Sequence, residues 1–296
     1  MDFRRNILVP VVLGFLIPSA ASVAETVAVT EVTSNVIVFA TSTGNVVASI
    51  GPDGAFLIGT PSAASTEQIS AILASKTKNP ARYVVISPEK PADWEGDAGW
   101  TKRGAFVVMQ EKALERWGGH KMGPPKPLPD RLIQLGVNRP AVAFSEVITF
   151  DLNGDGIHVV HQSPGFSNAD SIAHFHAANL LYFGEVFPGD GYPSIDPELG
   201  ANFNGFVKTL TPWTDVARRI VPARGRVMNG TDVKAFLDML TSVHDKVQQM
   251  IDAGKSEAEV VAAHPTAEFD TRWGHGRVSP DEFVSSVYKS LRLYRE

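Results

Sequence analysis

Short apolar stretches separated by turn signals fill the first part of the chain and predict β-strands. Residues 35–41 (NVIVFAT) and 45–50 (NVVASI) flank a glycine-containing turn, and residues 55–59 (AFLIG) follow Pro52-Asp53-Gly54. Proline, aspartate and glycine at such positions are typical of the turns that join hairpin strands. The chain is therefore expected to open with paired β-strands.

The apolar period then changes and predicts a helix over residues 65–75 (STEQISAILAS), because Ile69, Ile72 and Leu73 share one helical face. Ser65 and Gln68 have the spacing of a capping box, which predicts that the helix begins at Ser65. The elements predicted next are a strand at 82–87, a charged loop reaching residue 99, a strand at 104–109 and a helix ending at Trp117.

Five prolines between residues 118 and 140 predict a long ordered loop, because β structure resumes directly at 141–150 (AVAFSEVITF). Residues 151–156 (DLNGDG) predict a hairpin turn, and strands are predicted at 170–176 and 179–184. The last third is helical in pattern. Its longest helix is predicted at 230–252, after an Asn229 cap, with apolar positions at Val233, Phe236, Leu237, Leu240, Val243, Val247 and Met250.

The N-terminus has the composition of a secretory signal peptide. Arg4 and Arg5 precede an apolar stretch that is too short to span a bilayer comfortably, and Ser22 and Ala24 supply the small residues of a cleavage site. We therefore predict a signal peptide at 1–24, a single domain at 25–296 and export to the periplasm or beyond the cell. No later stretch approaches about 18 consecutive apolar residues, which argues against stable membrane insertion of the mature chain.

Charge and cysteine content narrow the function classes. Removing the predicted signal, with Asp2, Arg4 and Arg5, takes the formal charge from −5 to −6. This acidic balance argues against a nucleic-acid partner. The sequence contains no cysteine, which excludes thiol catalysis, disulfides and cysteine-ligated zinc. Hydrophobic residues make up 44% of the chain, which is enough to build the core of one large domain.

Five segments together resemble the metallo-β-lactamase superfamily, in particular its periplasmic hydrolase-like branch. They are residues 44–59 (GNVVASIGPDGAFLIG), 84–99 (VVISPEKPADWEGDAG), 165–187 (GFSNADSIAHFHAANLLYFGEVF), 192–206 (YPSIDPELGANFNGF) and 220–227 (IVPARGRV). They occur in the family's order and spacing. The resemblance implies an α/β fold, a four-layer αββα sandwich, with the site at the loop edge of its two sheets.

Enzymes of this family bind two zinc ions, which lower the pKa of a bridging water and so generate a hydroxide nucleophile. The resemblance places the first ligands, H-x-H-x-D-H, in the charged loop. Pro88 and Lys90 stand at the first two histidine positions, Ala92 at the aspartate and Asp93 at the third histidine.

The remaining ligand positions are changed as well. Phe166 stands at the later histidine, Glu185 at the bridging aspartate and Arg224 at the last histidine, and Gly59 replaces an aspartate that usually ends the third strand. Only Asp93 and Glu185 retain a side chain that coordinates metal. Because losing one supporting partner already costs roughly 10- to 100-fold in metal affinity, we expect neither metal nor another cofactor.

The charges that remain suggest a replacement for the metal. We hypothesise that Lys90 and Arg224 pair with Asp93 and Glu185 in the former metal cavity, because buried carboxylates need a compensating charge. The predicted ligand-binding pocket comprises Lys90, Asp93, Trp94, Asp97, Phe166, Asp170, Glu185, Tyr192 and Arg224.

Two further motifs resemble metal-binding patterns, but each also has a simpler structural interpretation. Residues 151–156 match the start of a calcium loop, but Gln162 replaces the glutamate at its twelfth position, so a hairpin turn is preferred. His174 and His176 would point to one face of a strand and, with His158 and His161, offer a relocated metal site. Exposed strand histidines are the preferred interpretation.

The sequence thus favours a non-catalytic protein of this fold that binds an unknown small molecule or protein partner. The alternative is a hydrolase of lactams, lactones or esters with a rebuilt, metal-independent site or a relocated metal. In the rebuilt site Lys90 would act as the base with Asp93 or Glu185, and Arg224 would stabilise an anionic intermediate.

Overall fold

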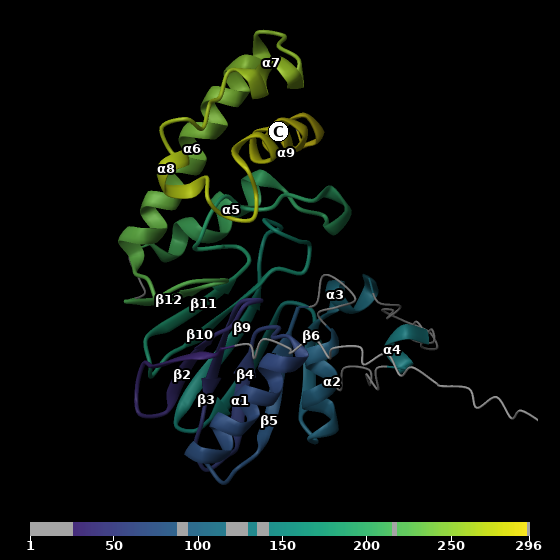
Figure 1. The fold of residues 1–296 in the computed structure, drawn as a ribbon, viewed down its shortest axis with the longest axis vertical. Coiled ribbons are helices and arrows are strands. Elements are labelled where there is room, and N and C mark those ends of the chain that lie inside the picture. The colour runs from purple at the N-terminus through teal and green to yellow at the C-terminus, as the bar shows by residue number, and fades with distance from the viewer. Residues whose placement is uncertain (1–25, 88–93, 117–129, 135–141, 215–217, 295–296) are drawn as a thin grey trace, which may run out of the picture.

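The computed structural model describes residues 26–87, 94–116, 130–134, 142–214 and 218–294, and these form two β-sheets with helices on their outer faces (Figure 1). The first sheet has seven strands in chain order. They are β1 (Ala28–Glu31), β2 (Val36–Ala40), β3 (Asn45–Ser49), β4 (Ala55–Ile58), β5 (Ala81–Ile86), β6 (Phe106–Gln110) and β7 (Val142–Phe144). Pairing is antiparallel up to β4 and parallel from β4 to β7.

The second sheet has five strands, in the order β12-β11-β10-β9-β8. They are β8 (Val147–Leu152), β9 (Asp155–His161), β10 (Ser171–Phe175), β11 (Leu180–Gly184) and β12 (Arg219–Pro222). Neighbours are antiparallel, except that β11 and β12 run parallel. The β structure predicted at 141–150 is divided between the two sheets, since the chain crosses from one to the other after β7 and begins β8 at Val147.

Helices cover both outer faces. Those of the first half are α1 (Ala63–Lys76), α2 (Trp94–Lys102), α3 (Glu111–Arg116) and α4 (Asp130–Gln134). Those of the second half are α5 (Phe203–Leu210), α6 (Gly230–Asp252), α7 (Glu257–Ala262), α8 (Asp270–Trp273) and α9 (Pro280–Leu293), with short 3-10 turns η2 (Pro197–Leu199) and η3 (Thr211–Trp213). In Figure 1 the yellow-green helices α6 to α9 occupy the top, and the blue helices α1 and α2 lie beside the first sheet.

Alternation along the strands creates three apolar layers, because successive side chains point to opposite faces of a sheet. In β2, Val36 and Val38 face the second sheet and pack with residues such as Phe150 and Phe175. Ile37 and Phe39 face outward and pack with Ile69 and other residues of α1 to α3. The third layer lies between the second sheet and helices α5, α6 and α9. Three buried layers define a four-layer αββα sandwich, as predicted.

Two local predictions are wrong. Helix α1 begins after Ser62, whose hydroxyl accepts the Ser65 N–H, so Ser65 is not the cap. Ala63 and Ala64 are strong helix formers that extend the helix back by one turn, while the Gln68 side chain accepts the Val27 N–H instead of closing a capping box. Residues 94–99, predicted as part of the charged loop, belong to α2 (Trp94–Lys102).

Other predictions are confirmed. Helix α6 begins after Asn229, whose side chain accepts the N–H groups of Thr231 and Asp232. Asn153 and Gly154, both with positive φ, form the two-residue turn between β8 and β9, so residues 151–156 make the preferred hairpin. Of the predicted loop 118–140, only α4 lies within the described residues. Among these residues, no helix is both long and apolar enough to cross a membrane.

Candidate functional site

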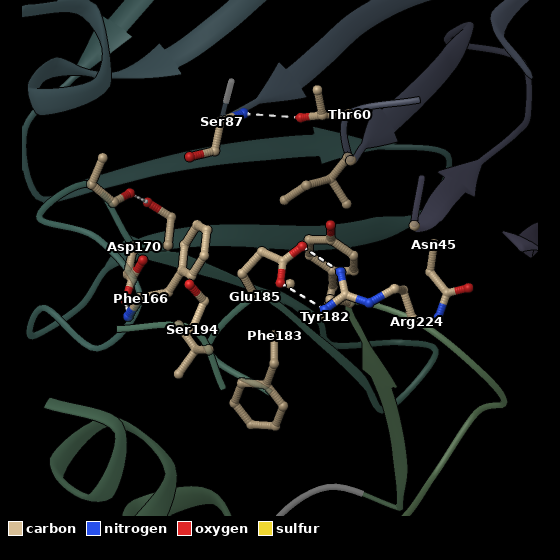
Figure 2. A pocket seen from close by; sticks show the side chains of 18 of the residues that line it. Asn45, Thr60, Ser87, Phe166, Asp170, Tyr182, Phe183, Glu185, Ser194 and Arg224 are labelled. Atoms are coloured by element: carbon tan, nitrogen blue, oxygen red, sulfur yellow. Dashed lines mark hydrogen bonds and ion pairs between the residues drawn. The ribbon is translucent and has the colours of Figure 1, made fainter. Parts of the chain in front are cut away.

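A cavity of about 530 Å³ lies at one edge of the two sheets, where β4, β5, β6, β11 and β12 end and β3 and β10 begin. Strand ends and the loops that follow them are where α/β proteins commonly place functional side chains. The cavity wall includes five of the residues predicted for the site, namely Phe166, Asp170, Glu185, Tyr192 and Arg224. Figure 2 shows several of them facing a common space.

Arg224 forms a two-pronged ion pair with Glu185 inside this cavity (Figure 2). Its Nη1 donates to Glu185 Oε1 at 2.5 Å and its Nη2 to Oε2 at 3.0 Å. Arg224 Nε also donates to both oxygens of Asp190, at 3.1 and 3.0 Å. One guanidinium thus serves two carboxylates in the planar geometry that arginine favours.

The register of the second sheet explains why these side chains meet. Strands β11 and β12 are parallel and adjacent, with Gly184 opposite Pro222, so Glu185 and Arg224 follow neighbouring strand ends. The pairing continues beyond the strands, since Ala223 N–H donates to Phe187 O and Arg224 N–H to Pro188 O. Gly189, with φ +84°, then turns the chain against the Arg224 backbone, where an added Cβ would lie 2.4 Å from Arg224 O. Asp190 is placed beside Arg224 by this turn.

The ion pairs shape the electrostatics of the cavity. Burial opposes the positive charge of Arg224, but hydrogen bonds and Coulomb attraction from Glu185 and Asp190 outweigh it and raise the pKa of Arg224. Burial, together with the nearby Glu185 charge, raises the pKa of the Tyr182 phenol far above its ordinary value. Tyr182 therefore stays a neutral hydroxyl group in the cavity wall.

Asp170 organises the loop that carries Phe166. Its Oδ2 accepts the N–H groups of Gly165 and Phe166, and its Oδ1 accepts the N–H and the hydroxyl of Ser167. Burial raises the pKa of Asp170 to about 7, although these hydrogen bonds lower it. Asp170 thus holds the loop in shape, and both of its oxygens are engaged.

Tyr192 packs as part of the wall. Its ring stacks on Phe283 with centroids 4.6 Å apart, and its hydroxyl donates to Asp270 Oδ1 at 2.7 Å. The segment around Tyr192 is also tied to the C-terminal region, because Tyr192 N–H donates to Trp273 O. The C-terminal helices therefore support this side of the cavity.

The remaining predicted site residues have different outcomes. Lys90 and Asp93 lie outside the described residues, as does the side chain of Trp94. Asp97 is 1% exposed in α2 and is not among the described residues that line the cavity. Residues 94–102 form a helix and not a loop, and Asp97 is buried in it, so its place in the site stays a prediction.

Sequence reasoning missed Asp190. Its only local signal is its position between two glycines in FPGDGYP, which indicates a turn and not a partner for a particular arginine. A clue was available in Arg224 itself, since a guanidinium has five N–H donors and a single carboxylate cannot satisfy them. Which second carboxylate it would bind depends on the fold.

Three of the predicted histidines cluster away from the cavity, on the helix-facing side of the second sheet. His158 and His174 are cross-strand partners. The His176 ring lies 3.9 Å from that of His174 and 4.7 Å from that of His158, between centroids. Only His176 is exposed, so the expectation of exposed histidines is wrong for the other two. His161 is half-buried too, and its Nε2 lies 3.0 Å from Asn168 O.

The cavity residues do not fit the zinc pair that the resemblance implies. Both oxygens of Glu185 accept hydrogen bonds from Arg224, and a guanidinium repels a metal cation. Phe166 and Gly59 line the same cavity without a donor atom in their side chains. Across the described part of the chain, no group of three or more histidine, aspartate or glutamate residues is arranged to hold a metal ion.

Comparisons with known proteins identify the fold. No protein-family model and no curated protein matches the chain. Among solved structures, a metallo-β-lactamase from Pontibacter korlensis covers 73% of this chain and 99% of its own, with a TM-score of 0.56 and 16% identity. The metallo-β-lactamase IND-7 covers 74% and 99%, with a TM-score of 0.56 and 14% identity.

A longer protein aligns over more of the chain. The stereoselective inverting sec-alkylsulfatase Pisa1 from Pseudomonas sp. covers 89% of this chain with a TM-score of 0.67 and 14% identity, and the match spans 50% of the alkylsulfatase. The chain therefore corresponds to about half the length of that protein. At these identities the matches establish the metallo-β-lactamase fold, in agreement with the resemblance seen in the sequence.

Proposed function

We propose that this chain, which has the metallo-β-lactamase fold, is an exported pseudoenzyme that binds a small molecule or a protein partner through its cavity without zinc catalysis. The observation that carries the proposal is the contact of Arg224 with both Glu185 and Asp190. By the resemblance, Glu185 and Arg224 stand at two positions that bind metal ions in metallo-β-lactamases. In this chain the two side chains form an ion pair with each other.

The chemistry of zinc supports this interpretation. Zinc sites need imidazole, carboxylate or thiolate donors at about 2.0–2.3 Å from the metal. To coordinate zinc, Glu185 would have to give up its hydrogen bonds to Arg224 and leave that guanidinium half-buried beside a second cation. Proline at 88, lysine at 90 and alanine at 92 remove further donors from the sequence.

The cavity itself supports binding. Its volume of about 530 Å³ falls within the range of roughly 300–1,000 Å³ that is usual for small-molecule sites. Its wall combines apolar side chains, including Ile58, Val85 and Phe166, with a few fixed polar groups. Such a combination gives a ligand apolar contact and orientation, and it needs no metal.

The decisive test combines zinc analysis with a hydrolysis panel. We expect purified protein to hold less than about one zinc per ten chains after equilibration with zinc and desalting, since lost ligands weaken a site by orders of magnitude. Lactam, lactone and aryl ester substrates should remain unhydrolysed with and without chelator. Stoichiometric zinc with chelator-sensitive turnover would disprove the proposal.

The same panel separates the alternative of a metal-independent hydrolase. Turnover that survives chelator but is lost in both Lys90→Ala and Glu185→Gln would establish that alternative. Lys234→Ala, on the exposed face of α6, is the matched control for removal of a lysine charge, because Lys234 contacts only the surface residue Asp238 among the interactions found for it. Turnover that persists in Lys90→Ala and Glu185→Gln would indicate a contaminating enzyme, and its loss in Lys234→Ala as well would show that the loss is not specific to the cavity.

A further inference from the structure

We infer that the cavity selects small molecules that carry an organic cation, such as a primary ammonium group, on an apolar body. This inference rests on the proposed binding function and names its ligand class. It follows from the charges in the wall and from the way in which Arg224 is already occupied.

Among the described residues, the ion-pair centre has one more negative charge than positive charge. Arg224 supplies one positive charge and contacts two carboxylates, Glu185 and Asp190. Their side chains are 35% and 37% exposed, whereas that of Arg224 is 13% exposed, so the acidic groups are the more accessible ones. Each carboxylate oxygen can accept more than one hydrogen bond, so both residues retain capacity for a ligand donor.

The other ionisable groups of the described part of the wall do not reverse this balance. The described lining contains four carboxylates (Asp170, Glu185, Asp190 and Asp196) and two guanidiniums (Arg224 and Arg277). Arg277 is exposed and donates to Ser42 O, at the turn between β2 and β3. Asp196 Oδ1 accepts the Glu198 N–H. If Asp170 is protonated, the three remaining carboxylates and the two guanidiniums of the described lining still sum to one negative charge.

An anionic ligand would meet an unfavourable site. To pair with Arg224 it would have to compete with Glu185, which binds through two parallel hydrogen bonds. It would also approach Asp190 at close range, and like charges repel. A cation instead adds the missing positive charge and donates to the open lone pairs of Glu185 and Asp190.

The walls suit the rest of such a ligand. Aromatic side chains at Phe166, Tyr182 and Tyr192 line the cavity together with aliphatic residues of the strand ends. In Figure 2 the Tyr182 ring is seen next to the Glu185–Arg224 ion pair, and the Phe166 ring is seen on the Glu185 side of that pair. Aromatic faces attract cations, and apolar walls gain free energy from covering an apolar body.

Isothermal titration with three matched probes tests the inference. These are 2-naphthylmethylamine, 2-naphthylmethanol and 2-naphthoate, which share one apolar body and differ in charge. At about pH 7.5 we expect the amine to bind at least roughly tenfold more tightly than the alcohol, as hydrogen bonds to charged groups suggest. The naphthoate should bind more weakly than the alcohol.

Two isosteric variants locate the effect. Asp190→Asn removes the uncompensated charge but retains an oxygen for Arg224 Nε, and it should lower the amine-to-alcohol affinity ratio by roughly fivefold or more. Asp238→Asn makes the same charge change on the exposed face of α6 and should leave the ratio unchanged within about twofold.

Any result other than these expected ones contradicts the inference. Equal affinities for all three probes would leave cavity binding intact but refute selection for cations. Tighter binding of naphthoate, equal responses of the two variants, or no binding of the amine would also refute it. The proposed function fails separately, through zinc binding or turnover, so the two failures are distinguishable.

Discussion

Arg224 reaches Glu185 through two parallel hydrogen bonds, and the two residues follow the ends of the parallel strands β12 and β11. A metal ion in this place would be exchangeable and would leave the carboxylate exposed when lost. A guanidinium is part of the chain and stays protonated at any physiological pH. The acidic cavity wall is thereby held in one arrangement whatever metals the surroundings contain.

Removing this cation should destabilise the protein. Arg224→Met leaves the half-buried Glu185 and the exposed Asp190 without their partner, and we expect the free energy of unfolding to fall by about 1–3 kcal/mol, less than for a fully buried pair. The double variant Arg224→Met/Glu185→Gln should recover part of the loss. Urea denaturation monitored by circular dichroism measures both.

A surface ion pair provides the control. Lys234 and Asp238 pair across one turn of α6, with side chains 67% and 63% exposed. Lys234→Met should therefore change the unfolding free energy by no more than about 0.5 kcal/mol. Equal losses in Arg224→Met and Lys234→Met would show that the Arg224 contacts contribute nothing specific.

Introducing at position 59 the aspartate that the resemblance to metallo-β-lactamases implies should not create a metal site. Gly59 has a φ of +131°, and an added Cβ would lie 2.7 Å from Asn45 O and 3.1 Å from the Val46 Cα. We expect Gly59→Asp to lose about 1–3 kcal/mol of stability through backbone strain, with a further loss from the clash. It should gain no measurable zinc affinity in a titration with a zinc-sensitive dye.

Gly104→Asp separates strain from clash. Gly104 also has a positive φ, +87°, but no atom within 4 Å of its ideal Cβ position. It should therefore lose less stability than Gly59→Asp in the same denaturation experiment. If the two variants lose the same amount, the backbone around Gly59 has room for a side chain and the strand end is less constrained than the structure indicates.

The fold could be predicted where local and global preferences agree. Helix α6 combines an Asn229 cap with a regular apolar stripe, and the hairpin at Asn153-Gly154 has the residues that its turn requires. Helix α2 was not predicted because its glycines disfavour a helix by local preference. Their presence is explained by close contact with another part of the chain. An added Cβ on Gly96 would lie 1.9 Å from Pro61 O, so Gly96 permits close packing of α2 against the start of α1.

The candidate site was predictable to the extent that its residues occupy motif positions. Phe166, Glu185 and Arg224 could be placed because the resemblance assigned each a ligand position. Asp190 has no such position, and it meets Arg224 only because Gly189 turns the chain back against β12. Asp97 lies close to the motif in sequence, in helix α2, and it is not among the described residues that line the cavity. The spacing of motif residues along the sequence identifies candidate site residues, whereas the register of the strands decides which of their side chains come into contact.

Asp170 should give the protein a distinctive pH dependence. Burial raises its pKa in the folded state to about 7, so between about pH 4 and pH 7 the folded chain retains a proton that the unfolded chain releases. The stability that this group contributes is therefore greatest below pH 4 and falls as the pH rises towards 7. Asp170→Asn should lack this decline when unfolding free energies at pH 5 and pH 8 are compared. Parallel changes in the two proteins would show that the hydrogen bonds from residues 165–167 hold the pKa near its ordinary value.

The histidine cluster should act in the opposite direction. Burial, and then the charges of His176 and His158, lower the pKa of His174, while the nearby Asp155 partly opposes this shift. Below about pH 6.5 the unfolded chain therefore takes up a proton more readily than the folded chain, and stability is lost as the pH falls through the lowered pKa.

Replacing one ring tests this coupling. His176→Gln removes the imidazole in contact with both others, so His174 should titrate closer to its ordinary pKa and the variant should lose less stability between pH 7.5 and pH 5. The matched control is His275→Gln, at an exposed position outside the cluster, which should keep the full acid loss. Two-dimensional NMR of the imidazole resonances follows each pKa directly. An unchanged pKa of His174 in His176→Gln would show that the His176 ring does not contribute to lowering it.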